Sequence, residues 1–211
     1  YEIKECDWSS DVCSSDLNSK ITAQQNQGSV TPPAGFTNYF GFTSQSAYSV
    51  TSSDYFVLMQ PVEGYNVSDL AWGTSSAKTV TLSFQVYSSL TGTFGGSIRN
   101  SAANRSYPFL YTVSSANTWT QISVTIPGDT TGTWLTNNGV GMYVTFTLGS
   151  GSSLLGTANT WGGANYHGAT GSLSLVGTSG ATFYFTGVQL EVGSSATSFD
   201  YRPYEIGRAH V

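Results

Sequence analysis

Residues 140–148 read Val-Gly-Met-Tyr-Val-Thr-Phe-Thr-Leu, and this stretch decides the fold. Apolar side chains occupy every second position, while glycine, tyrosine and threonine fill the positions between them. A repeat of two places one set of side chains on a single face of a β-strand. Because that apolar face must be buried against another layer, the stretch predicts one strand of a two-layer β protein.

The same alternation recurs along the chain. It predicts strands at 79–87, 107–113 and 119–126. Pro108 favours an edge position for the second of these, because proline cannot donate a backbone hydrogen bond. Residues 181–190 are apolar on both faces and predict a central strand covered on both sides. Weaker candidates are 36–42, 56–60, 94–99 and 172–176.

Turn-forming clusters rich in glycine, serine, threonine and asparagine separate these runs, and no window shows a helical repeat. We therefore expect an all-β protein, an antiparallel β-sandwich of the jelly-roll type. The chain is 39% hydrophobic, 14% aromatic and only 9% charged, which argues against disorder. It has no apolar run long enough for a membrane span and no basic block for nucleic-acid binding.

The two ends differ from the rest. Residues 7–17 resemble the translation of a common sequencing-library adapter, 1–3 its outer part, and 205–211 the same adapter on the other strand. We therefore expect 1–17 and 205–211 to be adapter-derived, 18–34 to be a linker or leading strand, and 35–204 to be the β-sandwich domain. Both cysteines, Cys6 and Cys13, lie in the first segment. The remainder keeps five basic and six acidic side chains, a net charge of −1.

Several short motifs point to one family. Residues 181–193 and 196–204 resemble the closing strand and tail of bacteriophage tail-fibre and related virion domains. Residues 63–70, 78–84, 105–109 and 128–134 are also similar to that family. The resemblance implies a jelly roll like that of carbohydrate-binding modules, in a homotrimeric fibre or tail component of the virion. Such modules often hold a structural calcium on acids of the closing strand, where this sequence has Thr186 and Gly187.

Few residues suggest catalysis. Between 18 and 204 the only histidine is His167, and no Gly-x-Ser-x-Gly nucleophile elbow accompanies it. A glycosidase needs two carboxylates around one sugar, but the six acids here are more simply explained as turn and capping residues, Asp129 among them. We expect no enzyme activity, no catalytic residue, no cofactor and no metal site.

Sugar binding is the positive hypothesis, because aromatic rings stack on sugars while amides pair with their hydroxyl groups. The candidate ligand-binding residues are Trp161, Tyr166, Asn165, His167 and Trp72, which lie outside the alternating runs. The alternative is that Trp72 and Trp161 pack into the ends of the sandwich. A flat sheet face is disfavoured, since Tyr87, Trp119 and Tyr143 are isolated in sequence.

These observations predict a non-enzymatic virion domain of a phage tail fibre that binds, or presents loops to, bacterial surface glycans. Its partners would be that glycan and two further copies of the chain, with no nucleic acid and no membrane. Two alternatives remain open: the carbohydrate-binding module of a secreted microbial glycosidase, and a small glycan depolymerase domain.

Overall fold

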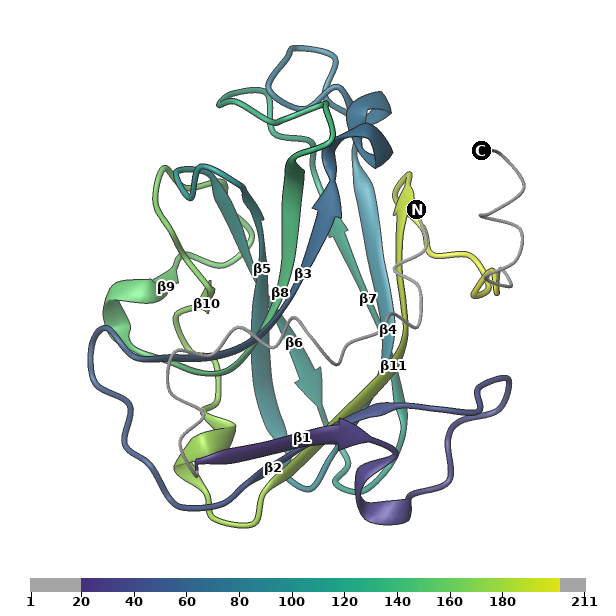
Figure 1. Ribbon diagram of the computed structural model, residues 1–211, viewed down its shortest axis with the longest axis vertical. Helices are drawn as coiled ribbons and strands as arrows, with labels where there is room; N and C mark the ends of the chain where they lie inside the picture. The colour runs from purple at the N-terminus through teal and green to yellow at the C-terminus, as the bar shows by residue number, and fades with distance from the viewer. Residues whose placement is uncertain (1–19, 202–211) are drawn as a thin grey trace.

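Two antiparallel β-sheets lie face to face in residues 20–201, the part of the chain that the computed structural model describes (Figure 1). The five-stranded sheet has the order β1 (Ile21–Gln25), β2 (Phe40–Ser44), β11 (Thr182–Val192), β4 (Val80–Ser88), β7 (Thr120–Ile126). The four-stranded sheet has the order β3 (Tyr55–Glu63), β8 (Val140–Ser150), β5 (Gly92–Asn100), β6 (Ser106–Val113). The predicted all-β, jelly-roll sandwich is confirmed.

The connections carry short elements. These are the 3₁₀ turns η1 (Gln27–Ser29), η2 (Gly64–Asn66), η3 (Ser68–Leu70), η4 (Ser152–Leu154) and η5 (Leu175–Gly177). Two-residue strands β9 (Leu155–Gly156) and β10 (Gly168–Ala169) pair in parallel. Figure 1 shows β9 and β10 beside β5, outside the sandwich, so the long connection between β8 and β11 lies over one outer sheet face.

The core lies between the two sheets and is rich in aromatic rings. Phe84 of β4 meets Phe146 of β8 edge to face, with 4.9 Å between ring centroids. Phe146 also stacks on Phe185 of β11 at 5.7 Å. All three side chains are buried, and each contributes about 1.5–3 kcal/mol through the area removed from water. The alternation in the sequence is therefore what joins the two sheets.

The sequence placed most strands correctly. The strand at 107–113 is β6, which lies at a sheet edge, and the strand at 181–190 is β11, which is central. The leading segment contains β1 rather than only a linker. The predicted strand at 172–176 is wrong: the chain there forms η5, because Leu175 and Val176 are both buried and a strand would turn one of them outward.

A bulge interrupts β11 between Thr186 and Gln189. Gly187 adopts a φ of 61°, and a Cβ added to it would lie 2.5 Å from Cζ of Phe36. Thr186 donates a 2.8 Å hydrogen bond from its hydroxyl to the carbonyl of Asn38. The two positions that the resemblance matched to calcium ligands therefore hold a tight contact between β11 and the segment before β2.

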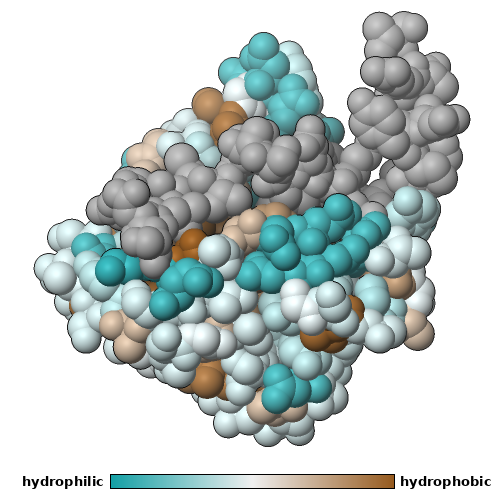
Figure 2. All heavy atoms as spheres, turned by 60° about the horizontal axis from the view of Figure 1, so that its bottom comes forward, coloured by the Kyte–Doolittle hydropathy of each residue, from teal (hydrophilic) through white to brown (hydrophobic). Residues whose placement is uncertain are grey.

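The surface reflects the uncharged composition. In Figure 2 most atoms are pale, the colour of residues of intermediate hydropathy, with separate hydrophilic and hydrophobic patches between them. No helix among the described residues is long and apolar enough to cross a membrane. The predicted adapter-derived segments, with both cysteines, lie outside the described residues.

Candidate functional site

The connection at residues 151–180 is fixed to the outer face of the four-stranded sheet by backbone hydrogen bonds. Leu173 donates to the carbonyl of Thr93 on β5 at 2.7 Å, and Asn159 donates to the carbonyl of Pro108 on β6 at 2.8 Å. Ser106 of β6 and Gly162 exchange two hydrogen bonds, at 3.0 and 2.8 Å. This covering segment contains four of the five predicted ligand-binding residues, and the bridge at Gly162 separates them into two groups.

Trp161 and Trp72 join a packed group with Trp134, here called the tryptophan cluster. The three indoles meet edge to face, with ring centroids 4.7 to 5.6 Å apart. Trp72 is buried, Trp161 is half-buried, and their indole N–H groups donate to the carbonyls of Lys78 and Pro127. These contacts favour packing for both residues, and glycan contact by either one stays a prediction.

Arg105 borders the tryptophan cluster. Its guanidinium lies 5.8 Å from the Trp161 ring and donates from Nε and Nη2 to the two carboxylate oxygens of Asp129, each at 2.7 Å. Burial raises the pKa of Asp129, but hydrogen bonds from Arg105 and Thr131 outweigh it, so the pKa lies below its ordinary value. The pair is a bidentate salt bridge, which fixes the turn that the sequence analysis assigned to Asp129.

Asn165 and His167 meet a residue that the sequence analysis missed, Arg99 of β5. Arg99 donates from Nη1 to Oδ1 of Asn165, and the same nitrogen lies 3.4 Å from Nε2 of His167. Its guanidinium carbon is 5.5 Å from the centroid of Tyr143 on β8. We call the following residues the Arg99 cluster: Tyr55, Met59, Arg99, Tyr143, Asn165 and His167.

Two residues of β3, Met59 and Tyr55, complete this cluster. Nη2 of Arg99 lies 2.7 Å from Sδ of Met59, and the ring of Tyr55 is 4.8 Å from that of His167. Tyr55, Met59 and Tyr143 are half-buried, whereas Arg99 and His167 are 5% exposed. The cluster is therefore a buried polar group rimmed by partly exposed aromatic and thioether side chains.

No carboxylate among residues 20–201 pairs with the positive charge of Arg99. In the described part of the chain, the salt bridge is that of Arg105 with Asp129, and Arg99 forms none. Burial lowers the pKa of Arg99, and the nearby Tyr143 and Tyr55 offset part of that effect. A guanidinium nevertheless stays charged in a protein, so the cluster holds an uncompensated buried cation.

His167 in contrast is neutral. Burial, followed by repulsion from Arg99, lowers the pKa of His167 to about 4. Because arginine can only donate, the Nε2 facing it must be the acceptor, and the ring proton is assigned to Nδ1. That Nδ1 is buried and has no hydrogen-bond partner.

Three more buried polar atoms without partners lie on the same sheet face: Nε of Arg99, Oγ of Ser97 and Oγ1 of Thr145. Ser97 is directly opposite Thr145, and Arg99 is directly opposite Tyr143. A buried polar group left unpaired costs about 1–3 kcal/mol. Four buried polar atoms without a partner on one sheet face make this region the candidate site.

Tyr166 lies between the two groups of loop residues. Its half-buried ring packs on the backbone of the covering segment, where a Cβ added to Gly156 would lie 2.4 Å from Cδ2 of the ring. The structure thus brings Asn165 and His167 to Arg99, joins Trp161 to Trp72, and leaves Tyr166 on the loop itself. The sequence feature that could have identified Arg99 is that it is the one charged residue in the strand predicted at 94–99.

The outer face of the other sheet holds aromatic residues that looked isolated in the sequence. Tyr87 and Tyr184 stack with centroids 5.5 Å apart, and Trp119 lies 5.5 Å from Tyr87. Tyr39 contacts both Tyr184 and Trp119. The expectation that Tyr87 and Trp119 stand alone is wrong, because neighbouring strands bring them together.

This group is largely covered rather than open. Tyr39 and Tyr184 are buried, and the hydroxyl of Tyr39 donates to the carbonyl of Gln27 in η1 at 2.7 Å. The indole N–H of Trp119 donates to the carbonyl of Thr31 at 2.9 Å. The segment around η1 therefore closes over the rings, which act as a second small core.

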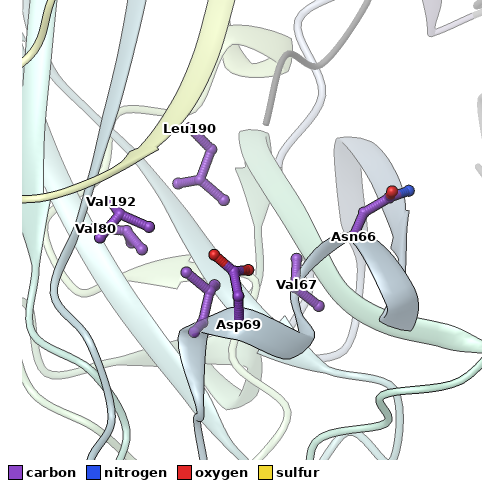
Figure 3. A pocket seen from close by; sticks show the side chains of 7 residues that line it. Asn66, Val67, Asp69, Val80, Leu190 and Val192 are labelled. Atoms are coloured by element: carbon purple, nitrogen blue, oxygen red, sulfur yellow. The ribbon is translucent and has the colours of Figure 1, made fainter. Parts of the chain in front are cut away.

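A small pocket lies at the opposite end of the same sheet (Figure 3). Its volume is about 180 Å³, and it is lined by Asn66, Val67, Asp69, Leu70, Val80, Leu190 and Val192. Apart from Asp69 and Asn66 its lining is apolar. Among residues 20–201, no three His, Cys, Asp or Glu side chains are grouped so that they could hold a metal ion.

No family model matches this chain, and no curated protein matches it. Solved structures that resemble it include a CBM4 structure, with a TM-score of 0.41, 14% identity, and coverage of 86% of this chain and 94% of that one. Another contains the CBM22-1 and GH10 modules of xylanase 10B from Clostridium thermocellum with xylohexaose. Its TM-score is 0.41 and its identity 15%, and the match covers 88% of this chain and 27% of that one. A third is a family 11 carbohydrate-binding module of a cellulosomal cellulase from the same organism. Its TM-score is 0.37 and its identity 14%, and the match covers 83% of this chain and 82% of that one.

Proposed function

We propose that this chain is a non-catalytic carbohydrate-binding domain whose site is the outer face of the four-stranded sheet at the Arg99 cluster. The observation that carries the proposal is the set of buried, unpaired donors beside partly exposed tyrosine rings. Sugar hydroxyl groups accept hydrogen bonds from such donors, while the apolar face of a sugar ring packs on an aromatic ring. The Arg99 cluster thus offers both hydrogen-bond donors and aromatic rings, the two kinds of group that bind sugars.

Three carboxylates of the described chain lack the raised pKa expected of a catalytic acid. A glycosidase keeps one acid protonated by raising its pKa. The pKa values of Asp54, Asp129 and Glu191 are instead lowered, with hydrogen bonds from Thr51, Arg105 and Thr197, respectively, among the causes. None of the three belongs to the Arg99 cluster.

For the biological setting we propose a virion domain of a phage tail fibre that binds a bacterial surface glycan and works as a homotrimer. The resemblance of residues 181–204 to tail-fibre domains and the uncharged composition support this setting. The alternatives are a module of a secreted microbial glycosidase and a small depolymerase domain. Genes that flank the locus distinguish them: virion genes support the fibre, and secreted hydrolase genes contradict it.

The binding function is tested with a glycan array that includes neutral and acidic oligosaccharides. The full chain is compared with Tyr143→Ala, which removes a ring at the site, and with Tyr65→Ala, which removes a ring of η2 that is 63% exposed and lies outside the Arg99 cluster. We expect Tyr143→Ala to weaken capture about tenfold, the loss expected for one stacked ring, and Tyr65→Ala to leave it unchanged. Absence of binding to every glycan would contradict the proposal.

A further inference from the structure

Arg105 and Arg99 differ in what their guanidinium edges contact. Arg105 uses the edge formed by Nε and Nη2 to hold both oxygens of Asp129 at 2.7 Å. The same edge of Arg99 has no oxygen acceptor, because Nε is unpaired and Nη2 faces only the thioether of Met59. A thioether is a weak acceptor, so this edge of Arg99 is the one that lacks a proper partner.

The other side of the guanidinium is already occupied. Nη1 of Arg99 donates to Asn165 and faces Nε2 of His167, which are both neutral acceptors. Neither of them cancels the charge. A ligand group that completes the cluster should therefore carry one negative charge and offer two coplanar oxygens, the arrangement that a guanidinium edge binds in a bidentate manner.

We propose that the Nε/Nη2 edge of Arg99 is a subsite for the carboxylate of an acidic sugar, so that the chain binds carboxylated glycans in preference to neutral ones. This inference rests on the proposed carbohydrate-binding function. The carboxylate takes the place that Asp129 has at Arg105. The partly exposed rings of Tyr55 and Tyr143 lie at the rim of the same cluster and pack on the sugar ring.

Met59 is the side chain that the ligand displaces. Its sulfur contacts Nη2, and the residue is half-buried at the rim of the cluster on β3, next to Thr145 of β8. Methionine has three rotatable side-chain bonds and changes position at low cost. The carboxylate therefore reaches the guanidinium edge without a change in the sheet.

The experiment pairs each acidic oligosaccharide with its methyl ester, which keeps the sugar skeleton and removes the charge. Binding of the full chain to uronic-acid and sialic-acid oligosaccharides, their esters and sulfated analogues is measured by array and then by calorimetry. We expect the acids to bind about 10- to 100-fold more tightly than their esters, as charged hydrogen bonds predict. The acids should also exceed the sulfated analogues, which present a tetrahedral group.

Two substitutions locate the effect. Arg99→Gln should abolish the preference for acid over ester, and Arg99→Lys, which keeps the charge but not the planar edge, should restore it only partly. Lys78→Gln is the matched control, since it removes one exposed positive charge elsewhere and should leave the preference intact. Thermal melts show whether each variant is folded, and the comparison of acid with ester on the unaltered chain requires no variant.

Equal affinity for acid and ester would overturn the carboxylate subsite while leaving carbohydrate binding in place. A preference that survives in a folded Arg99→Gln variant, or one for sulfated over carboxylated sugars, would also overturn it. Absence of binding to any glycan, neutral or acidic, would overturn the proposed function together with the subsite.

Discussion

The indole of Trp161 meets the indole of Trp72 edge to face, with 5.3 Å between their centroids and an angle of 80° between their planes. The two residues are far apart in sequence and come from different loops. Their contact ties the covering segment to the end of the sandwich, on the far side of the Gly162 bridge from the Arg99 cluster. One loop thus serves packing with its first half and the candidate site with its second.

Replacing Trp161 with alanine should destabilise the fold. The substitution leaves a cavity beside Trp72 and Trp134, and the expected loss is about 2–4 kcal/mol in the free energy of unfolding, measured by urea denaturation. Tyr65→Ala is the control, because an exposed ring should cost less than about 0.5 kcal/mol. An unchanged midpoint together with lost glycan capture would instead assign Trp161 to ligand stacking.

Stability should depend on the protonation of His167. Its pKa is about 4 in the folded chain, below the ordinary value of 6.5, so between these pH values the unfolded state binds a proton that the folded state does not. The free energy of unfolding therefore falls as pH drops from 6.5 to 4, by at most about 3 kcal/mol, and the loss is complete below pH 4.

The check is a set of denaturation curves between pH 4 and 7 for the unaltered chain and for His167→Gln. Arg99 and Tyr55 face the imidazole, and Arg99 does not titrate in this range. The variant should lose most of the slope between pH 5 and 6.5, where the carboxylates of both states are largely ionised. Parallel curves for the two proteins would show that another group is responsible.

Gly187 should not tolerate a side chain. Its positive φ and its contact with the Phe36 ring both oppose a Cβ, so Gly187→Ala should cost about 1–3 kcal/mol in unfolding free energy. Gly163→Ala serves as the control, because a Cβ added there has no atom within 4 Å. Equal stability of the two variants would mean that the bulge in β11 relaxes at no cost.

Deleting residues 1–17 and 205–211 together should leave the sandwich intact. The buried core of the described residues runs from Ile21 to Leu190, and the sequence of neither end carries the alternating apolar pattern of a strand. We expect the unfolding free energy to change by less than about 0.5 kcal/mol, the range of neutral surface changes. A loss of several kcal/mol would show that an end contributes to the fold.

The strands could be predicted because each one carries its own repeat of two. Residues 80–88 and 140–150 show which side chains face the core without reference to any other part of the chain. Predicting the contact between Tyr87 and Trp119 also requires the register of β4 with β7, which places Gln85 opposite Gln121. Without that register the sequence could not show that their rings meet.

The Arg99 cluster could not be predicted in the same way. Arg99 lies 66 and 68 residues before Asn165 and His167, and their meeting depends on the path of an irregular loop. That path is set by backbone hydrogen bonds, such as those between Ser106 and Gly162, to which the side-chain pattern gives no clue. The sequence analysis grouped Trp161 with His167 because the two are close in sequence. The bridge at Gly162 lies between them, so Trp161 joins the tryptophan cluster and His167 joins the Arg99 cluster.

The way the covering segment is attached has an evolutionary consequence. Its links to the sheet at Asn159, Gly162 and Leu173 use main-chain atoms, which every amino acid except proline supplies in full. Exposed side chains of this segment outside the tryptophan cluster can therefore be exchanged while the path of the loop and the sandwich beneath it persist. If the proposed function holds, such exchanges alter ligand specificity at little cost to folding, while Arg99 keeps its place in the sheet.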